Sequence, residues 1–365
     1  MKGRFALISP VKAMPENKAL FALCALLAVA EWLVGFDLDF QVYFGAAADY
    51  SDGGWQKVYS PQAITPFKYH PITVWLFAPM RFFPWSVATA LWALLNAFFT
   101  FDACRRFQKY FEAANWVPVL ALLCVGHAWS WQVKFGNVTC LMLWLFALFA
   151  TSSVLWKKAG SVAALILLKP FWVVLLPVFV LEKSWKALGL TLALVAAGCA
   201  AIFLSGLDNG LLAYDLWQKT LADPTNAHNY PKNDNQCIYA TLCRGGAFWG
   251  ADKTWVWVLV SGEYFALALL TVSRNHALRA LALLPPMLFA GPLSWIHHQI
   301  LLIPVFIFLL SRRHFWLAAI AAFLFTGTGE AFVGRQLFVM IHQAGLPVLG
   351  FLALSLGFTA NRKWF

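Results

Sequence analysis

Two carboxylates stand at the end of the first apolar segment, in the stretch Gly35-Phe36-Asp37-Leu38-Asp39. A carboxylate beside hydrocarbon is costly unless it is paired or faces water, so this position predicts a functional site. Lys169, His297 and His298 stand far along the chain and could supply positive charge. Such a set suits the transfer of a sugar from a sugar phosphate, because the incoming hydroxyl needs one base and the departing phosphate needs cations.

Other polar residues that interrupt the apolar runs fall on the same predicted face as the two carboxylates. We expect these side chains to contact the substrate: Asp37, Tyr43, Tyr69, His70, Asn137, Asn235, Gln236, Trp295 and Arg335. Their gathering on one face favours an enzyme, because an alternating transporter needs a site near the middle of the membrane. A flippase or transporter of a lipid-linked or anionic substrate is the alternative from a different class.

The elements that position these residues are those of an integral membrane protein. Of 365 residues, 61% are hydrophobic and 12% are charged, and the mean hydropathy is +0.68. A soluble domain carries roughly 25% charged residues. Apolar runs of roughly 17–25 residues recur, which predicts helices and not membrane β-strands. We predict one all-α polytopic domain over residues 1–365, with about ten full transmembrane helices, a short helical hairpin and interfacial helices in the first outer loop.

The net charge of +11 indicates orientation and not a nucleic-acid partner. Basic pairs such as Arg105-Arg106, Lys157-Lys158 and Arg312-Arg313 lie at the ends of predicted spans, on alternate connections. The positive-inside rule then predicts that both termini are cytoplasmic. It places the first outer loop (37–70) and the long outer loop (206–253) on the opposite side.

The segment from Lys157-Lys158 to Lys183 has basic residues at both ends, yet it is too short for two full crossings of a ~30 Å core. A single crossing would put its two basic ends on opposite faces, against the positive-inside rule. Pro170 interrupts the apolar run, and proline removes a helical hydrogen bond. We predict two short helices in a hairpin, with Lys169 at a tip that reaches a polar cavity. One tilted helix with a proline kink is the alternative.

Six short motifs occur in an order that resembles one family. They are Asp39-Phe40-Gln41-Val42-Tyr43, Tyr69-His70-Pro71, Gly136-Asn137-Val138-Thr139, Lys169-Pro170, Asn235-Gln236-Cys237 and Ser294-Trp295-Ile296-His297-His298. From about Asp37 to Arg313 the chain is similar to glycosyltransferase family 87, the polyprenyl-phosphate-mannose-dependent mannosyltransferases of the GT-C fold. Asn137 and Thr139 stand where many members have Gln and Asn, and Cys237 replaces the usual Ser.

The resemblance implies a membrane glycosyltransferase that takes mannose from a polyprenyl-phosphate donor on the outer face of a bacterial inner membrane, with inversion at the anomeric carbon. It implies that Asp39, the first residue of an Asp-x-x-x-Tyr motif, is the general base. Lys169, His297 and His298 are then expected to bind the donor phosphate. The expected partners are the donor lipid, a glycan or glycolipid acceptor, and membrane lipids. Transfer of a pentose in place of mannose stays open.

No cofactor and no metal ion are expected, because the acidic and histidine residues show no compact ligand spacing. Lys169 with a histidine could supply the counter-charge instead. Cys237 and Cys243 share the long outer loop, where a disulfide is an open question. Glu31 and Glu263 lie inside predicted spans, and the sequence suggests no function for either.

Overall fold

The computed structural model describes residues 17–36, 38–60, 67–222, 258, 261–263, 265–266, 275–290, 296–324, 326, 330–343, 350 and 353–354. Among these residues every regular element is a helix. The first half comprises α1 (Lys18–Val34), α2 (Asp39–Val58), α3 (Ile72–Phe77), η1 (Ala78–Phe82), α4 (Trp85–Tyr110), α5 (Trp116–Cys124), α6 (Gly126–Phe135) and α7 (Thr139–Thr151). The second half comprises α8 (Leu155–Leu168), η2 (Pro170–Leu175), α9 (Leu176–Leu181), α10 (Trp185–Ala201), η3 (Ile202–Ser205), α11 (Leu207–Ala222), α14 (His276–Ala290), η5 (Ile296–Leu302), α15 (Ile303–Ser311), α16 (Phe315–Leu324) and α17 (Glu330–Gln343).

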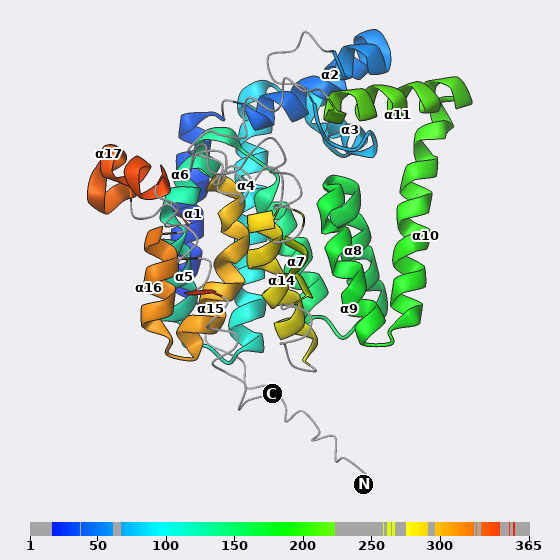
Figure 1. Ribbon diagram of the computed structural model, residues 1–365. Helices are drawn as coiled ribbons and strands as arrows, with labels where there is room; N and C mark the ends of the chain where they lie inside the picture. The colour runs from blue at the N-terminus through cyan, green and yellow to red at the C-terminus, as the bar shows by residue number, and fades with distance from the viewer. Residues whose placement is uncertain are drawn as a thin grey trace.

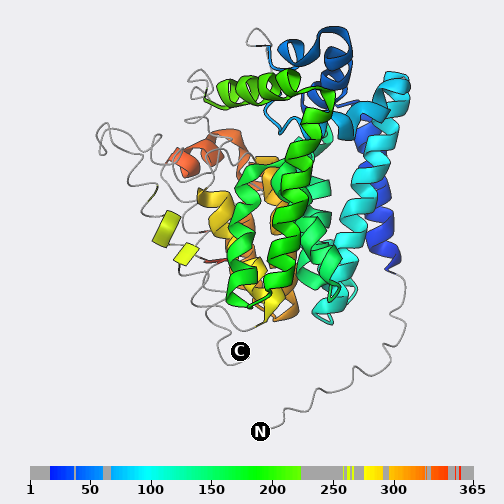
Figure 2. The same ribbon diagram turned by 90° about the vertical axis from the view of Figure 1, so that its right-hand side faces the viewer.

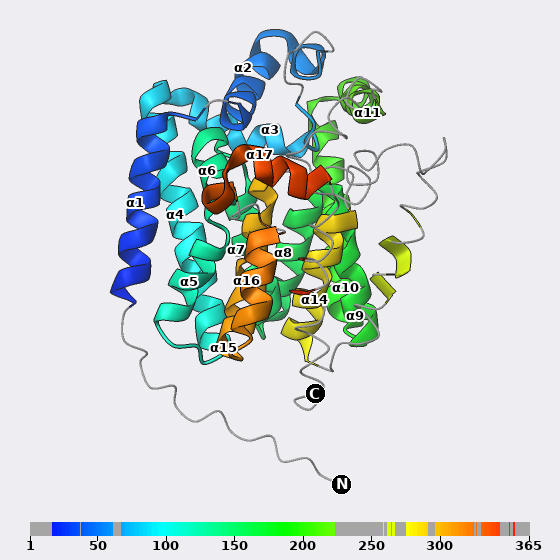
Figure 3. The same cartoon turned by 60° about the vertical axis from the view of Figure 1, so that its left-hand side comes forward.

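The long helices stand side by side as an upright bundle, and α2 and α11 lie across its upper end (Figure 1). We call this the α2 end, and the opposite one the α9 end. Along the bundle α1 packs against α4, α4 against α7, α7 against α8, and α8 against α10 (Figure 2). Figure 3 shows that α17 also lies across the α2 end, beside α6. The bundle therefore supplies helix ends and turns to a region under α2.

The turn after α1 delivers Asp39 to this region. Asn17 caps the start of α1, where its side chain accepts a hydrogen bond from the Leu20 N–H at 3.0 Å. Gly35 ends the helix with φ +80°, a left-handed conformation that glycine adopts without the steric cost of a Cβ. The chain therefore leaves the axis of α1, and α2 begins at Asp39 across the end of the bundle.

Fewer helices are long enough to cross a membrane than the sequence predicts. In the described residues Trp85–Tyr110 and Trp185–Ser205 qualify, and counting the bent pairs α1 with α2 and α5 with α6 raises the number to four. The apolar stretch of α5 and α6 is divided near Val125, where the two helices are bent by 72°. Helix α7 has 13 residues, about 20 Å at 1.5 Å per residue, which is short of a ~30 Å core. Ten full crossings are therefore not confirmed by the described part of the chain.

The chain turns back at Lys169, as the sequence predicts. Helix α8 ends at Leu168, and Lys169 is extended, with φ −143° and ψ 114°, before η2 and α9. His276 at the start of α14 contacts the carbonyl of Phe149 near the end of α7 and the carboxylate of Glu182 just after α9. The start of α8 and the end of α9 thus lie at the same end of the bundle, and Lys169 lies at the tip between them.

Elements η5 and α15 form the most enclosed part of the bundle. Every residue from Ile296 to Leu310 is buried, which requires neighbours on all sides of the helix. Helix α10 is the opposite case, because most of its apolar residues are exposed at the surface of the bundle. The two histidines carried by η5 therefore stand in a tightly packed environment.

Candidate active site

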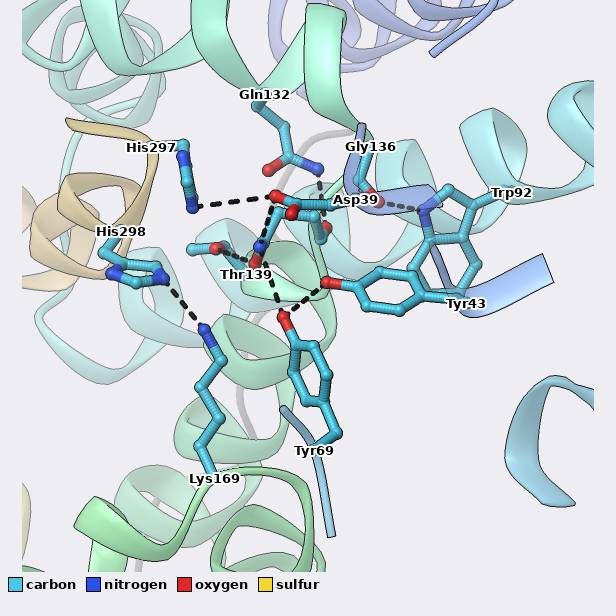
Figure 4. Close-up of polar contacts among 11 residues, drawn as sticks. Asp39, Tyr43, Tyr69, Trp92, Gln132, Gly136, Thr139, Lys169, His297 and His298 are labelled. Atoms are coloured by element: carbon cyan, nitrogen blue, oxygen red, sulfur yellow. Dashed lines mark hydrogen bonds and ion pairs between the residues drawn. The ribbon is translucent and has the colours of Figure 1, made fainter. Parts of the chain in front are cut away.

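Asp39 lies in the first turn of α2, with 31% of its side chain exposed. Its Oδ2 accepts a hydrogen bond from Asn137 Nδ2 at 2.8 Å. Asn137 comes from the turn between α6 and α7, 98 residues further along the chain. Figure 4 shows the carboxylate facing His297 and the side on which Lys169 and His298 lie. The carboxylate is thus held by one donor and keeps an open side.

The turn that carries Asn137 is rigid. Gly136 has φ +64°, and a Cβ there would lie 2.7 Å from the ring of Phe36 and 2.9 Å from Phe40, so only glycine fits. The indole of Trp92 donates to the Gly136 carbonyl at 2.7 Å. Thr139 Oγ1 lies 2.8 Å from Asn137 Oδ1 and donates to it. An ionised carboxylate can only accept, so the amide nitrogen of Asn137 faces Asp39 and the amide oxygen faces Thr139.

Two tyrosines close one side of the carboxylate. Tyr69 Oη lies 3.4 Å from Asn137 Nδ2, and the hydroxyls of Tyr43 and Tyr69 share a short hydrogen bond. Tyr59 donates to the Tyr69 carbonyl at 2.9 Å, which fixes the backbone of this loop. Tyr43 stacks on Phe77 with 4.6 Å between ring centroids. Both phenols predicted to contact substrate therefore lie beside Asp39.

Lys169 approaches from the tip of the hairpin. Its Nζ lies 2.9 Å from His298 Nε2 and 5.3 Å from the centre of the Tyr69 ring. An ammonium group can only donate, so Nε2 of His298 accepts this bond. Lys169 also interacts electrostatically with Asp39. The extended backbone at Lys169 leaves the helix axis and lets a cation from a broken helix reach a buried region.

His297 lies next to both the Asp39 carboxylate and the ring of His298. Its Nε2 lies 4.0 Å from Asp39 Oδ2, which is beyond hydrogen-bond distance. Its ring packs edge-on against His298, with centroids 4.5 Å apart, and against Phe135. Its side chain is 6% exposed, and neither ring nitrogen has a hydrogen bond within the described residues. Buried polar groups without partners are uncommon and indicate a missing ligand or water.

Two predicted substrate residues are engaged elsewhere. His70 Nε2 lies 3.2 Å from Tyr214 Oη, and burial lowers the pKa of His70 to about 4. Arg335 on α17 donates to Glu330 at 3.1 Å, and Glu330 lies 3.3 Å from His127 of α6. The structure does not bring either His70 or Arg335 to Asp39.

Four other predicted substrate residues, Asp37, Asn235, Gln236 and Trp295, lie outside the described residues, as do Cys237 and Cys243.

Two buried glutamines were missed by the sequence analysis. Gln132 in α6 donates through Nε2 to the Asn137 carbonyl at 2.7 Å, and its Oε1 has no partner in the described structure. Gln299, next to the two histidines, has no partner for either side-chain atom there. Gln132 stands between Trp131 and Val133, and Gln299 begins the apolar run that continues from Ile300; a polar amide beside such residues is the signal that could have drawn attention to them.

The carboxylate, amide and imidazole groups do not form a recognisable metal site. Among the described residues no group of three His, Cys, Asp or Glu side chains could hold a metal ion. What the arrangement offers is a carboxylate on one side and a lysine–histidine pair on the other, with neutral polar groups between them (Figure 4).

The comparison with known families is consistent with this chemistry. The model of glycosyltransferase family 87 matches residues 67–293, more than half of the chain. The chain belongs to glycosyltransferase family 87. No match is found among curated proteins or among solved structures. The all-helical described part and its apolar helices are consistent with the membrane-embedded GT-C fold.

The family match is narrower than the resemblance read from the motifs. It includes Tyr69, Asn137 and Lys169, but it begins after Asp39 and ends before His297. Membership of family 87 therefore establishes a glycosyltransferase. Asp39 and His297 lie outside the match, and they are connected to it by their contacts with Asn137 and Phe135.

Proposed function

We propose that this family 87 enzyme transfers mannose from a polyprenyl-phosphate donor to a hydroxyl of a glycan or glycolipid, with Asp39 as the general base. The observation that carries the proposal is the position of the Asp39 carboxylate. It is held by Asn137 at 2.8 Å and faces the side on which the Lys169–His298 pair and the ring of His297 lie, and the ring nitrogens of His297 have no hydrogen bond among the described residues (Figure 4). A base and a phosphate-binding cation on opposite sides of one region suit a direct displacement.

In the proposed step the acceptor oxygen attacks the anomeric carbon and forms the new glycosidic bond. The bond from that carbon to the phosphate oxygen breaks, and its electron pair leaves with the polyprenyl phosphate. The acceptor proton passes to the Asp39 carboxylate. Because nucleophile and leaving group occupy opposite faces of the sugar, the configuration inverts. A phosphate leaves as a stable anion, so this reaction needs no second carboxylate to act as an acid, unlike ordinary glycoside hydrolysis.

The phosphate is expected to bind at the Lys169 side. The ammonium of Lys169 supplies charge, and its 2.9 Å contact with His298 fixes its direction. His297 has two ring nitrogens without hydrogen bonds in the described structure, and it can donate to a phosphate oxygen. Preorganised donors of this kind stabilise the charge that develops on a leaving group.

The distribution of basic residues supports an outward-facing site. Lys158 interacts with Glu182 at the α9 end, and Tyr110 at the end of α4 bonds to Asn275 at the same end. Helix α15 leads from η5 to Arg312, also at the α9 end (Figure 1). By the positive-inside rule this end is cytoplasmic. We therefore propose that the α2 end faces the outside of a bacterial inner membrane, that both termini are cytoplasmic, and that the chain makes the ten crossings its sequence predicts.

The test is turnover by the purified protein in detergent or in vesicles. Polyprenyl-phosphate-mannose labelled in the sugar should be consumed, with release of polyprenyl phosphate and an inverted linkage in the product. Polyprenyl-phosphate-pentose serves as the comparison donor. Movement of intact donor across vesicles without bond cleavage would instead indicate a flippase, and faster turnover of the pentose donor would overturn mannose as the sugar.

A further inference from the structure

Beside Asp39 lies a second oxygen that needs a hydrogen-bond donor. Gln132 is fully buried, and its Nε2 donates to the carbonyl oxygen of Asn137 at 2.7 Å. A carbonyl can only accept, so this contact fixes which end of the amide is nitrogen. Oε1 therefore points away from Asn137, and in Figure 4 it faces the space between Asp39 and His297. No described residue donates to it.

Asn137 fixes the positions of both acceptors, the Asp39 carboxylate and the Gln132 amide. Asn137 Nδ2 binds the Asp39 carboxylate, and the Asn137 carbonyl binds Gln132. Thr139 and the Gly136 turn hold Asn137 in place. An ionised carboxylate and an amide oxygen are both acceptors, so neither can satisfy the other. A buried acceptor left without a donor is costly, which indicates that the ligand of this position brings one.

We propose that Gln132 selects acceptors carrying two neighbouring hydroxyls, one of which gives its proton to Asp39 while the other donates to Gln132 Oε1. A sugar offers such a pair, whereas a serine side chain or a simple lipid alcohol does not. The Gln132 contact thus favours the sugar part of the proposed glycan or glycolipid over an isolated alcohol. This inference rests on the proposed function and adds to it the residue that recognises the second hydroxyl of the acceptor. Gln132 acts here as a specificity-determining residue.

The first experiment uses the wild-type enzyme with polyprenyl-phosphate-mannose and a panel of acceptor probes. The probes are octyl mannoside, octyl glucoside, octyl galactoside and 1-octanol. Linkage analysis of the product identifies the hydroxyl that reacts, and the monodeoxy probes lacking each neighbouring hydroxyl are then compared. We expect transfer to at least one glycoside and not to 1-octanol. Removing one neighbouring hydroxyl should lower kcat/KM by about 10- to 100-fold, because a buried polar group is then left unpaired.

The second experiment tests whether that hydroxyl meets Gln132. Gln132→Met removes the acceptor oxygen, and Thr139→Val is the matched control, because it loosens Asn137 without touching Oε1. In Gln132→Met the transfer rate should fall more than donor hydrolysis, since water carries no second hydroxyl, and most of the fall should be in the acceptor KM. This variant should no longer distinguish the parent glycoside from the deoxy probe. Thr139→Val should lower transfer and hydrolysis together and keep the distinction.

The outcomes separate this inference from the proposed function. No turnover of the donor, with or without an acceptor, contradicts the proposed function itself. Turnover with equal transfer to 1-octanol and the glycosides, or with transfer to none of the diol probes, overturns only the acceptor class. An equal loss of transfer and hydrolysis in Gln132→Met would assign Gln132 to the donor sugar. If that variant does not fold, the deoxy probes on the wild type still decide the matter.

Discussion

Both ends of the bundle pair a histidine with a carboxylate, and the two pairs differ in their hydrogen bonding. At the α9 end, Nδ1 of His276 lies 2.7 and 2.8 Å from the two carboxylate oxygens of Glu182, and its Nε2 lies 3.0 Å from the carbonyl oxygen of Phe149. At the α2 end, Nε2 of His297 lies 4.0 Å from Asp39 Oδ2 and makes no hydrogen bond with a described residue. Both ring nitrogens of His276 thus have hydrogen-bond partners, whereas neither ring nitrogen of His297 has one among the described residues; we call the first pair saturated and the second unsaturated.

This difference distinguishes a structural contact from a candidate binding site. The saturated pair joins α7, α9 and α14, and Arg279 adds positive charge 3.7 Å from Glu182. A fully satisfied polar network makes its surroundings rigid. The unsaturated pair leaves His297 and Gln132 with unused polar atoms in a buried place. Such atoms cost free energy until a ligand binds them, and for this reason we propose that the α2 end binds substrate and that the α9 end stabilises the bundle.

The largest effect should come from Asp39→Asn. An amide can still accept the hydrogen bond from Asn137, so the fold is kept while the base is lost. Turnover should fall about 10²–10⁴-fold, the usual contribution of a general base. Sugar transfer and the thermal unfolding temperature should be measured in the same detergent. Asp49→Asn is the matched control, because Asp49 is on the same helix and pairs with Lys57 at the surface; an equal loss in both variants would remove Asp39 from its role.

Next in size is Lys169→Met, which removes the charge and keeps the aliphatic stem. We expect turnover to fall about 10²-fold or more, because charge stabilisation of the leaving group is lost. The donor KM should rise as well, and Lys169→Arg should recover part of the loss. Lys219→Met is the control, since Lys219 is exposed on α11 at the same end and pairs with Asp215. Unchanged turnover in Lys169→Met would place the phosphate elsewhere.

The α9 end should respond in stability and not in turnover. Glu182→Gln leaves His276 and Arg279 without their carboxylate, which should lower the free energy of unfolding by about 3–5 kcal/mol. The rate per folded molecule should stay close to that of the wild type. Denaturant unfolding in detergent, with turnover at a temperature where both proteins are folded, gives the two numbers. If Glu182→Gln instead lost turnover without losing stability, the assignment of a purely structural role to the α9 end would be wrong.

The smallest effect concerns His70, a buried histidine with no carboxylate. Burial lowers its pKa to about 4, from 6.5. Between these values the unfolded chain binds a proton that the folded protein does not, so stability falls as the pH drops from about 6.5 towards 4. We expect a loss of about 1–2 kcal/mol at pH 5 relative to pH 7. His70→Gln should flatten this part of the curve. If the two curves keep the same slope, another group causes the acid sensitivity.

Part of the site was predictable because polar residues are expensive in a membrane. Lys169 stood out beside Pro170 inside an apolar run, and the structure places it at the tip of a reversal. Asp39, Asn137 and His298 were noticed for the same reason, and they do meet. The sequence predicted that these residues lie on one face of the membrane. Basic residues mark every second connection as cytoplasmic, and these polar residues fall on the other connections.

Other features could not be read from the sequence. The lengths of the helices depend on where packing breaks them, as at Val125, where α5 and α6 bend by 72°. His70 and Arg335 were expected at the substrate, yet His70 contacts Tyr214 of α11 and Arg335 donates to Glu330 of its own helix, α17. Gln132 drew no attention, because its importance lies in a contact with the backbone of Asn137 and in the direction that this contact leaves for Oε1.

Apolar runs thus determined by themselves that this chain is helical and membrane-embedded. Basic pairs and a proline beside a lysine predicted the reversal at Lys169, and the order of the polar residues predicted that Asp39, Asn137, Lys169 and the two histidines lie at one end. Only the tertiary structure decided which carboxylate–histidine pair is saturated and which is open. The physical reason is that a hydrogen bond depends on tenths of an ångström and on direction. Both are set by the packing of residues about a hundred positions apart, such as Asp39 and Asn137.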